Sequence, residues 1–268
     1  MKSNWKKYNG SLIAKFPPHK IIKENKIEIN QKIKESDVLF ARWITDFDCK
    51  SKTSFWYVIN DKHMELCDYS SNTRNQIKKG LLNFSIKIVP SSVILKNGYN
   101  IYQNVFREYN SILKIKSEAK YLESLKGNYE FWGVFYKNKL VGYSQNKIKH
   151  NACDYSTIKI SRKYNHKYAS YALFFTMNSF YLKDKKLKYV SDGARSILHK
   201  SNIQDFLIKK FKFRRAYCLL NVMYHPHIKI FVEILYPFRK IFNFLPFDFF
   251  RKLSIVLRQE ALVRNNLK

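Results

Sequence analysis

The segment 168–182 is the feature that most limits how this chain can fold. It is apolar nearly all the way round a helical projection, so a helix there must be covered on all sides. Segments rich in β-branched and aromatic residues stand on both sides of it, at 154–160 and 188–191, and are typical of strands. A buried helix between two strands predicts a mixed α/β fold in which the helix packs on a sheet.

Other segments repeat this mixture of elements. Further strands are predicted at 11–16, 38–45, 55–59, 84–89 and 216–223. Segments 131–136 and 140–143 flank Lys137-Asn138-Lys139 and predict a β-hairpin, because Asn tolerates a left-handed backbone. Helices are predicted at 70–82, with N-cap residues in Ser70-Ser71-Asn72, and at 203–210. A helical stripe that should pack on the sheet consists of Tyr99, Tyr102, Phe106 and Tyr109.

After His225-Pro226 the pattern becomes amphipathic. Pro237 is expected to kink or split a first helix, and a second helix is expected at about 247–263. The apolar stripe of the first helix and its continuation consists of Ile228, Phe231, Val232, Leu235, Phe238, Phe242 and Leu245. Residues 226–268 contain eight Lys/Arg against three Asp/Glu. Such a tail suits an anionic membrane surface, but it equally suits helices that dock on the domain core.

The chain has a formal net charge of +30, from 50 Lys and Arg against 20 Asp and Glu. This charge favours anionic partners such as cofactor phosphates, nucleic acid or acidic lipids, although a general bias toward Lys, Asn and Ile accounts for part of it. The four widely spaced cysteines predict neither a metal site nor disulfides. The N-terminus is polar, and no segment reaches roughly 18 uncharged apolar residues. We therefore expect a cytoplasmic protein, and any contact with a membrane is expected to be peripheral and on its inner face.

Common local signatures of nucleotide, hydrolase and metalloprotease sites, such as Gly-x-Gly-x-x-Gly or His-Glu-x-x-His, are absent from the sequence. The order of elements is more informative. A serine, arginine and basic-pair pattern at 70–81 precedes a strand, and Leu140-Val141-Gly142-Tyr143, Tyr189-Val190-Ser191-Asp192-Gly193 and Phe211-Lys212-Phe213-Arg214 follow in turn. In this succession the chain resembles Fem-type members of the GNAT acyltransferase superfamily over most of residues 1–224.

The resemblance implies a GNAT-like central, mostly antiparallel twisted sheet flanked by helices, with the amphipathic tail as an appendage. It divides the chain into a strand-rich, truncated first half (1–69), a GNAT-like acyltransferase domain (70–225) and the basic tail (226–268). It also implies an enzyme that moves an acyl group from acyl-CoA or aminoacyl-tRNA. The implied acceptor is an amino or hydroxyl group of a cell-surface saccharide or peptidoglycan precursor, including lipid-linked forms.

The segment 161–169 departs from the CoA-binding members of the superfamily. Those members carry a glycine-bearing pyrophosphate loop at this place, and here the segment has no glycine. Arg162, Lys163 and Lys167 are the candidates for binding cofactor phosphates through side-chain charge. Fem-type enzymes, which use aminoacyl-tRNA, also lack that loop, so acyl-CoA is one of two expected donors.

Candidate catalytic residues follow the predicted strand 188–191, because sites on open sheets lie beyond strand ends. Asp192 and His199 are candidate bases, and Arg195 is assigned to cofactor binding in the same loop. Tyr217 is a candidate acid, with Tyr224 as its alternative. A purely structural role for these residues is the alternative, because Asp192-Gly193 is a common turn pattern and a lone His is more often structural.

A basic helix face is predicted from Arg74, Lys78 and Lys79. It either binds a phosphate of tRNA, cofactor or lipid-linked sugar or is simply solvated. Two other functions also fit the sequence: a non-catalytic GNAT-like binding protein and a basic nucleic-acid-binding module. The enzymatic interpretation requires that strands near 131–160 and 189–224 splay apart beside the buried helix, opening a slot for an activated carbonyl.

Overall fold

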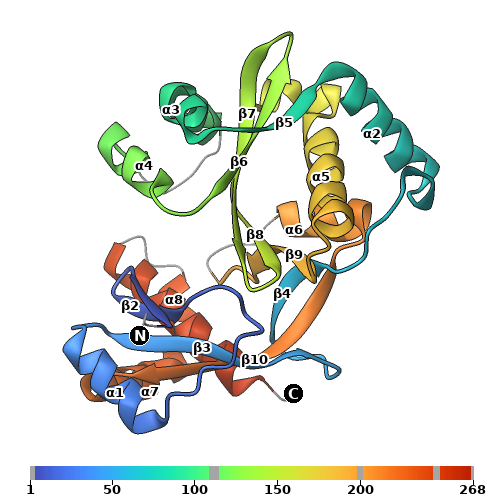
Figure 1. Cartoon of the computed structure of the whole chain (residues 1–268). Helices are drawn as coiled ribbons and strands as arrows, with labels where there is room; N and C mark the ends of the chain where they lie inside the picture. Colours follow the sequence, from blue (N-terminus) through green and yellow to red (C-terminus); the bar gives the residue numbers. More distant parts are fainter. Residues whose placement is uncertain (1–3, 109–114, 198–201, 244–247, 267–268) are drawn as a thin grey trace. The chain divides into compact units, whose positions relative to one another are not determined.

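The computed structural model describes residues 4–108, 115–197, 202–243 and 248–266. They form two compact units, each assembled from separate stretches of chain (Figure 1). Unit 1 comprises residues 1–58, 194–202 and 215–268, and unit 2 comprises 59–193 and 203–214. The division at residues 70 and 226 that the sequence pattern suggested stays a prediction, whereas the compact units place 215–268 with the N-terminal segment.

Unit 2 is a sheet with helices on both faces. Its strands, in their order across the sheet, are β9 (Tyr189–Ala194), β8 (Ala152–Ile160), β7 (Lys139–Lys149), β6 (Glu130–Tyr136) and β5 (Ser85–Val89). Its helices are α2 (Ser71–Asn83), α3 (Ser91–Glu108), α4 (Glu118–Leu125), α5 (Ala169–Ser179) and α6 (Asn202–Phe211). Short turns are η1 (Leu66–Asp68), η2 (Arg162–Lys167) and the π-helical η3 (Phe180–Asp184). In Figure 1, α3 and α4 lie on one side of β5 to β8, and α2 and α5 lie on the other.

Strand pairing in unit 2 is mostly antiparallel, as expected. β5 to β8 form three antiparallel pairs, and β8 and β9 form a parallel pair. The hairpin predicted around Asn138 is present: Lys137 and Asn138 have φ values of 46° and 63°, which match the right-handed twist of the strands. His150 and Asn151 make an equivalent turn between β7 and β8.

The buried helix is α5, which continues into η3. Its side chains are covered around most of the helix, and the fully buried ones are Ala169, Ala172, Leu173, Phe174 and Met177. On one side α2 approaches so closely that a Cβ at Gly80 would lie 2.6 Å from the Tyr168 carbonyl oxygen. Glycine is therefore needed at this crossing, and the prediction of a buried helix is confirmed.

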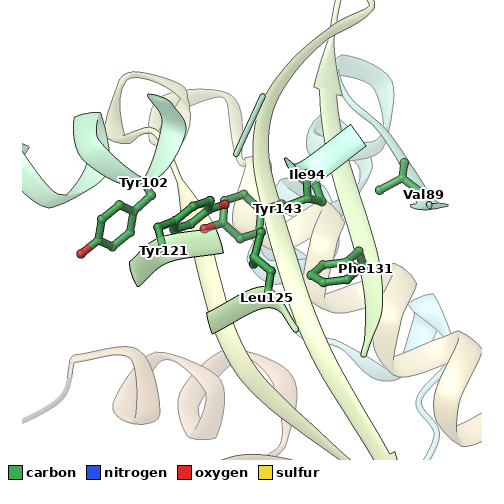
Figure 2. Close-up of a cluster of buried hydrophobic side chains, with 7 residues drawn as sticks. All are labelled: Val89, Ile94, Tyr102, Tyr121, Leu125, Phe131 and Tyr143. Atoms are coloured by element: carbon green, nitrogen blue, oxygen red, sulfur yellow. The ribbon is translucent and has the colours of Figure 1, made fainter. Parts of the chain in front are cut away.

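The aromatic stripe predicted near residue 100 packs on the opposite face of the sheet. Figure 2 shows Tyr102 of α3 and Tyr121 of α4 beside Tyr143, in a cluster with Phe131 of β6. The Tyr102 and Tyr121 rings stack with centroids 5.3 Å apart. These aromatics form core, as the sequence indicated. Tyr109 of the predicted stripe lies outside the described residues.

Unit 1 holds a sheet in the order β1 (Trp5–Tyr8), β2 (Ser11–Ala14), β3 (Phe40–Cys49), β10 (Arg214–Tyr224) and β4 (Phe55–Asn60), where β10 begins in unit 2 and β4 ends there. The sequence interpretation missed β1 and the helix α1 (Lys26–Glu35). The β1–β2 turn is Asn9-Gly10, a strong hairpin signal. α1 begins with a capping box of Asn25 and Glu28, and it buries Ile29 and Ile33.

The tail consists of α7 (Pro226–Leu235), η4 (Tyr236–Phe238), η5 (Ile241–Asn243) and α8 (Asp248–Arg264). The predicted break is confirmed, since α7 ends just before Pro237. α8 belongs to the core of unit 1: Leu257 is fully buried, and the Asn266 side chain pairs with the backbone N–H and C=O of Leu220.

The apolar stripe predicted for the tail is partly wrong. Val232 is buried, and Ile228, Leu235 and Phe242 are half-buried, but Phe231 and Phe238 are exposed. The reason is that α7 is apolar over two adjacent arcs. One arc packs on unit 1, whereas the other, with Ile230, Phe231 and Ile234, faces outward. Leu245 lies outside the described residues.

Candidate active site

The candidate site lies where the parallel strands β8 and β9 part. Within the described segment 115–197, their register runs only from Ala152 opposite Tyr189 to Asp154 opposite Ser191. β8 then continues through Ile160 while it pairs with β7 on its other side. Sites on open sheets favour the carboxyl ends of neighbouring parallel strands.

A β-bulge coincides with this point. In the β7–β8 ladder, Lys147 lies opposite Asp154 and Gln145 lies opposite Thr157. Two residues of β8, Tyr155 and Ser156, therefore face one residue of β7. A bulge bends its strand and redirects side chains, and the β8–β9 pairing ends at the same point.

Asp192 lies on β9, one residue beyond the last paired position, and is half-buried. Burial and the nearby charge of Asp154 raise the pKa of Asp192 to about 7, and a hydrogen bond from Gln204 opposes that shift. The carboxylate can therefore take up and release a proton near neutral pH, which is what a general base or acid needs.

Two expectations about this segment are corrected. β9 extends to Ala194, so Asp192 lies within a strand and not in a loop after one. Asp192-Gly193 is not an ordinary turn either: Gly193 has φ +87° and its N–H donates to Ser191 Oγ at 3.0 Å, inside the strand. These residue types are typical of a turn, but the strand β9 continues through both positions to Ala194.

Residues around Asp192 that sequence reasoning missed are Asp154, Tyr155 and Gln204. Ser156 Oγ donates to Asp154 Oδ2 at 2.6 Å, and the buried Tyr155 hydroxyl donates to Asn178 of α5 at 2.8 Å. Asp154 stands in a predicted strand, so its sequence context held one signal, a carboxylate among apolar strand residues. Gln204 carried none, because α6 comes beside β9 only through the fold.

The basic residues Arg162, Lys163 and Lys167 lie on η2, between β8 and α5. The Arg162 backbone N–H donates to Glu108 at 2.9 Å, which ties η2 to the end of α3. Lys167 Nζ lies 5.3 Å from the Tyr136 ring centroid. Tyr168, with φ 65°, takes the left-handed conformation at the start of α5, where no side chain caps the helix.

The remaining candidates lie elsewhere. Arg74, Lys78 and Lys79 lie on α2, where both lysines are exposed. Arg195 and Tyr217 belong to unit 1 and both approach Trp56. Tyr224 packs on Phe40, and burial raises its pKa, which makes it a weaker acid. His199 lies outside the described residues.

Across the described ranges, no group of three or more His, Cys, Asp or Glu residues is placed to hold a metal ion. In the same part of the chain, no helix has both the length and the apolar character needed to cross a bilayer.

The sequence matches no protein-family model, and no curated protein matches it. Among solved structures it is similar to FemX, with a TM-score of 0.51 and 9% identity, over 79% of this chain and 81% of FemX. It is also similar to the C-terminal domain (DUF2156) of a protein described as a lysylphosphatidylglycerol synthetase from Agrobacterium fabrum (TM-score 0.49, 10% identity). That match covers 71% of this chain and 66% of the other, just under two thirds of its length. The parallel β8–β9 pair beside α5, within a mostly antiparallel sheet, and the likeness to FemX together show that this chain has a GNAT/Fem-like fold.

Proposed function

We propose that this protein is an acyltransferase in which Asp192 acts as the general base. The observation that carries the proposal is a half-buried carboxylate with a pKa of about 7 where two parallel strands part. Such perturbed groups concentrate at functional sites. The GNAT/Fem-like fold that the chain shares with FemX supports the same class of reaction.

The proposed step is direct transfer. The Asp192 carboxylate takes a proton from the acceptor amine or hydroxyl as that atom attacks the carbonyl carbon of the donor ester or thioester. The bond from the carbonyl carbon to the leaving oxygen or sulfur breaks, and the proton passes from Asp192 to the leaving group. Burial and, after it, the charge of Asp154 raise the pKa of Asp192 to about 7, so Asp154 acts on the reaction through Asp192.

The donor that we favour is an aminoacyl ester on tRNA. Acyl-CoA requires a place for its pyrophosphate, which CoA-binding relatives hold with the amides of a glycine-bearing loop. Here η2 has no glycine, and α2 packs on the first turn of α5, where a Cβ at Gly80 would lie 3.2 Å from the Ala172 nitrogen. The residues present do not fit a glycine-lined cradle. Their charge, from Arg162, Lys163 and Lys167, suits phosphates bound by side chains, including those of RNA.

The proposed acceptor is a cell-envelope saccharide or peptidoglycan precursor, with α7 to η5 in contact with the membrane that carries it. Five large apolar side chains are more than half exposed there: Ile230 (57%), Phe231 (60%), Ile234 (61%), Phe238 (53%) and Ile241 (56%). Lys229 and Lys240 are exposed in the same segment. Apolar side chains with neighbouring lysines match the chemistry of an anionic bilayer surface.

The test measures transfer of a labelled amino acid from charged tRNA to a lipid-linked peptidoglycan precursor in vesicles. Asp192→Asn should lower kcat by about 10²- to 10⁴-fold, because it keeps the shape of the side chain and removes the base. Asp184→Asn is the matched control, since Asp184 is an exposed carboxylate of the same unit, and its activity should stay within about twofold of wild type.

Thermal unfolding with charged tRNA, acetyl-CoA and a long-chain acyl-CoA identifies the donor, because a ligand that prefers the folded state raises Tm. A rise with charged tRNA alone supports the aminoacyl ester. If no donor raises Tm and no transfer occurs, the non-catalytic binding protein is the better description.

A further inference from the structure

Two guanidinium groups lie against the indole ring of Trp56 of β4. Arg195 Cζ lies 4.4 Å from the indole centroid, and Arg215 Cζ lies 4.8 Å from it. Tyr217 contacts the same indole edge-on, with centroids 6.0 Å apart. All four residues belong to unit 1, although they come from three separate stretches of the chain.

The backbone of β4 holds this cluster in place. Arg195 Nη1 donates to the Ser54 carbonyl oxygen at 2.5 Å, and the Arg195 backbone N–H donates to the Trp56 carbonyl oxygen at 2.8 Å. Phe55, the residue between them, is buried in a core cluster with Cys218 and Leu220. Because side chains alternate along a strand, Trp56 projects from the other face. Arg215 is exposed, whereas Arg195 and Trp56 are half-buried, so a solute can reach the cluster.

The two positive charges have no carboxylate to neutralise them in the described part of the chain. Arg214, the neighbour of Arg215, makes an ion pair with Asp61 at 2.5 Å, but no ion pair joins Arg195 or Arg215 to an acid. Burial, and the nearby charge of Arg215, lower the pKa of Arg195. Two like charges that both lie against one indole ring, and of which one lowers the pKa of the other, leave an unfavourable electrostatic energy that a bound anion would remove.

We propose that Arg195, Arg215 and Trp56 form a binding site for a phosphate-bearing ligand with two or more negative charges, either a pyrophosphate or neighbouring phosphodiesters. Guanidinium groups are planar forks that bind phosphate oxygens in pairs, so two of them suit several oxygens better than one carboxylate. The site goes beyond the proposed acyl transfer, and its test needs no activity. The same chemistry is found in nucleotide-linked precursors and in the backbone of tRNA.

The experiment is calorimetric titration of the full chain with inorganic pyrophosphate and, separately, with uncharged tRNA. Arg215→Gln should weaken binding at least about tenfold, since it removes a charge-assisted hydrogen bond. Arg195→Gln should do the same. Lys34→Gln is the matched control, because it removes one exposed positive charge from the same unit, and it should change affinity less than about twofold.

The two titrations distinguish a small diphosphate ligand from the phosphodiester backbone of an RNA. Arginine-dependent binding of pyrophosphate supports a small diphosphate ligand, and arginine-dependent binding of tRNA alone supports phosphodiesters. Arg215→Lys keeps the charge but loses the fork, so its affinity should lie between those of wild type and Arg215→Gln. The proposal is overturned if wild type binds neither probe, or if Arg215→Gln binds each probe that wild type binds with unchanged affinity. Because the Arg215 side chain is exposed, a loss of binding in Arg215→Gln is not explained by misfolding.

Discussion

The raised pKa of Asp192 predicts that the free energy of unfolding depends on pH. Its pKa rises from 3.8 to about 7 on folding, because of burial and then the charge of Asp154. Between about pH 4 and 7 the folded state thus holds a proton that the unfolded state releases, so this group's contribution to stability is lost as pH rises toward 7. Asp192→Asn should match wild type in urea unfolding at pH 4 and exceed it at pH 8 by on the order of 1–4 kcal/mol. Asp154→Asn should shift the rising limb of the kcat/KM profile to lower pH. Equal stability of wild type and Asp192→Asn at both pH values would contradict the assigned environment.

The helix α7 has one apolar face that packs on unit 1 and a second apolar face that is exposed. Val232 faces its own unit, while Ile230, Phe231 and Ile234 face outward. The variant Ile230→Ser/Phe231→Ser should fold normally and lose at least about tenfold in affinity for vesicles of phosphatidylglycerol and phosphatidylcholine, measured by co-sedimentation, because the buried apolar area supplies most of the binding. Leu82→Ser is the matched control: this leucine of α2 is 87% exposed, and its loss should leave vesicle binding unchanged. Unchanged binding of the α7 variant would remove the membrane contact from the proposal.

At the scale of the whole chain, residues near its end pack within unit 1 against residues near its beginning. Leu257 of α8 is fully buried in unit 1, Arg42 donates to Gln259 at 3.1 Å, and Ser54 donates to the Leu262 carbonyl at 2.5 Å. Leu257→Ala should therefore lower the free energy of unfolding of unit 1 by about 2–5 kcal/mol in urea. Leu82→Ala, on an exposed surface, should change it by less than about 0.5 kcal/mol. If Leu257→Ala were neutral, α8 would be a detachable appendage, as one interpretation of its sequence allowed.

Local patterns predicted much of this architecture because they depend on neighbouring residues. Ser70 caps α2, Asn138 allows the hairpin turn, and Pro237 follows the end of α7. The misses had other causes. The sequence pattern does not separate α1 from the surrounding lysines and isoleucines despite its capping box, and it predicts a loop at Asp192-Gly193, where the strand β9 continues to Ala194. Asp192 itself was identified from its position after apolar strand residues.

By itself, the sequence determined the mixed α/β class, the buried character of α5 and the candidate carboxylate, because periodicity and residue type act over a few positions. Only the tertiary structure decided what surrounds that carboxylate and which positive charges lie against the same aromatic ring. Asp154 and Gln204 reach Asp192 through strand pairing and helix packing, and Trp56, Arg195 and Arg215 meet from distant parts of the chain. Burial and charge proximity depend on distances in space, so no local pattern could have set the pKa of Asp192 or placed two arginines on one indole.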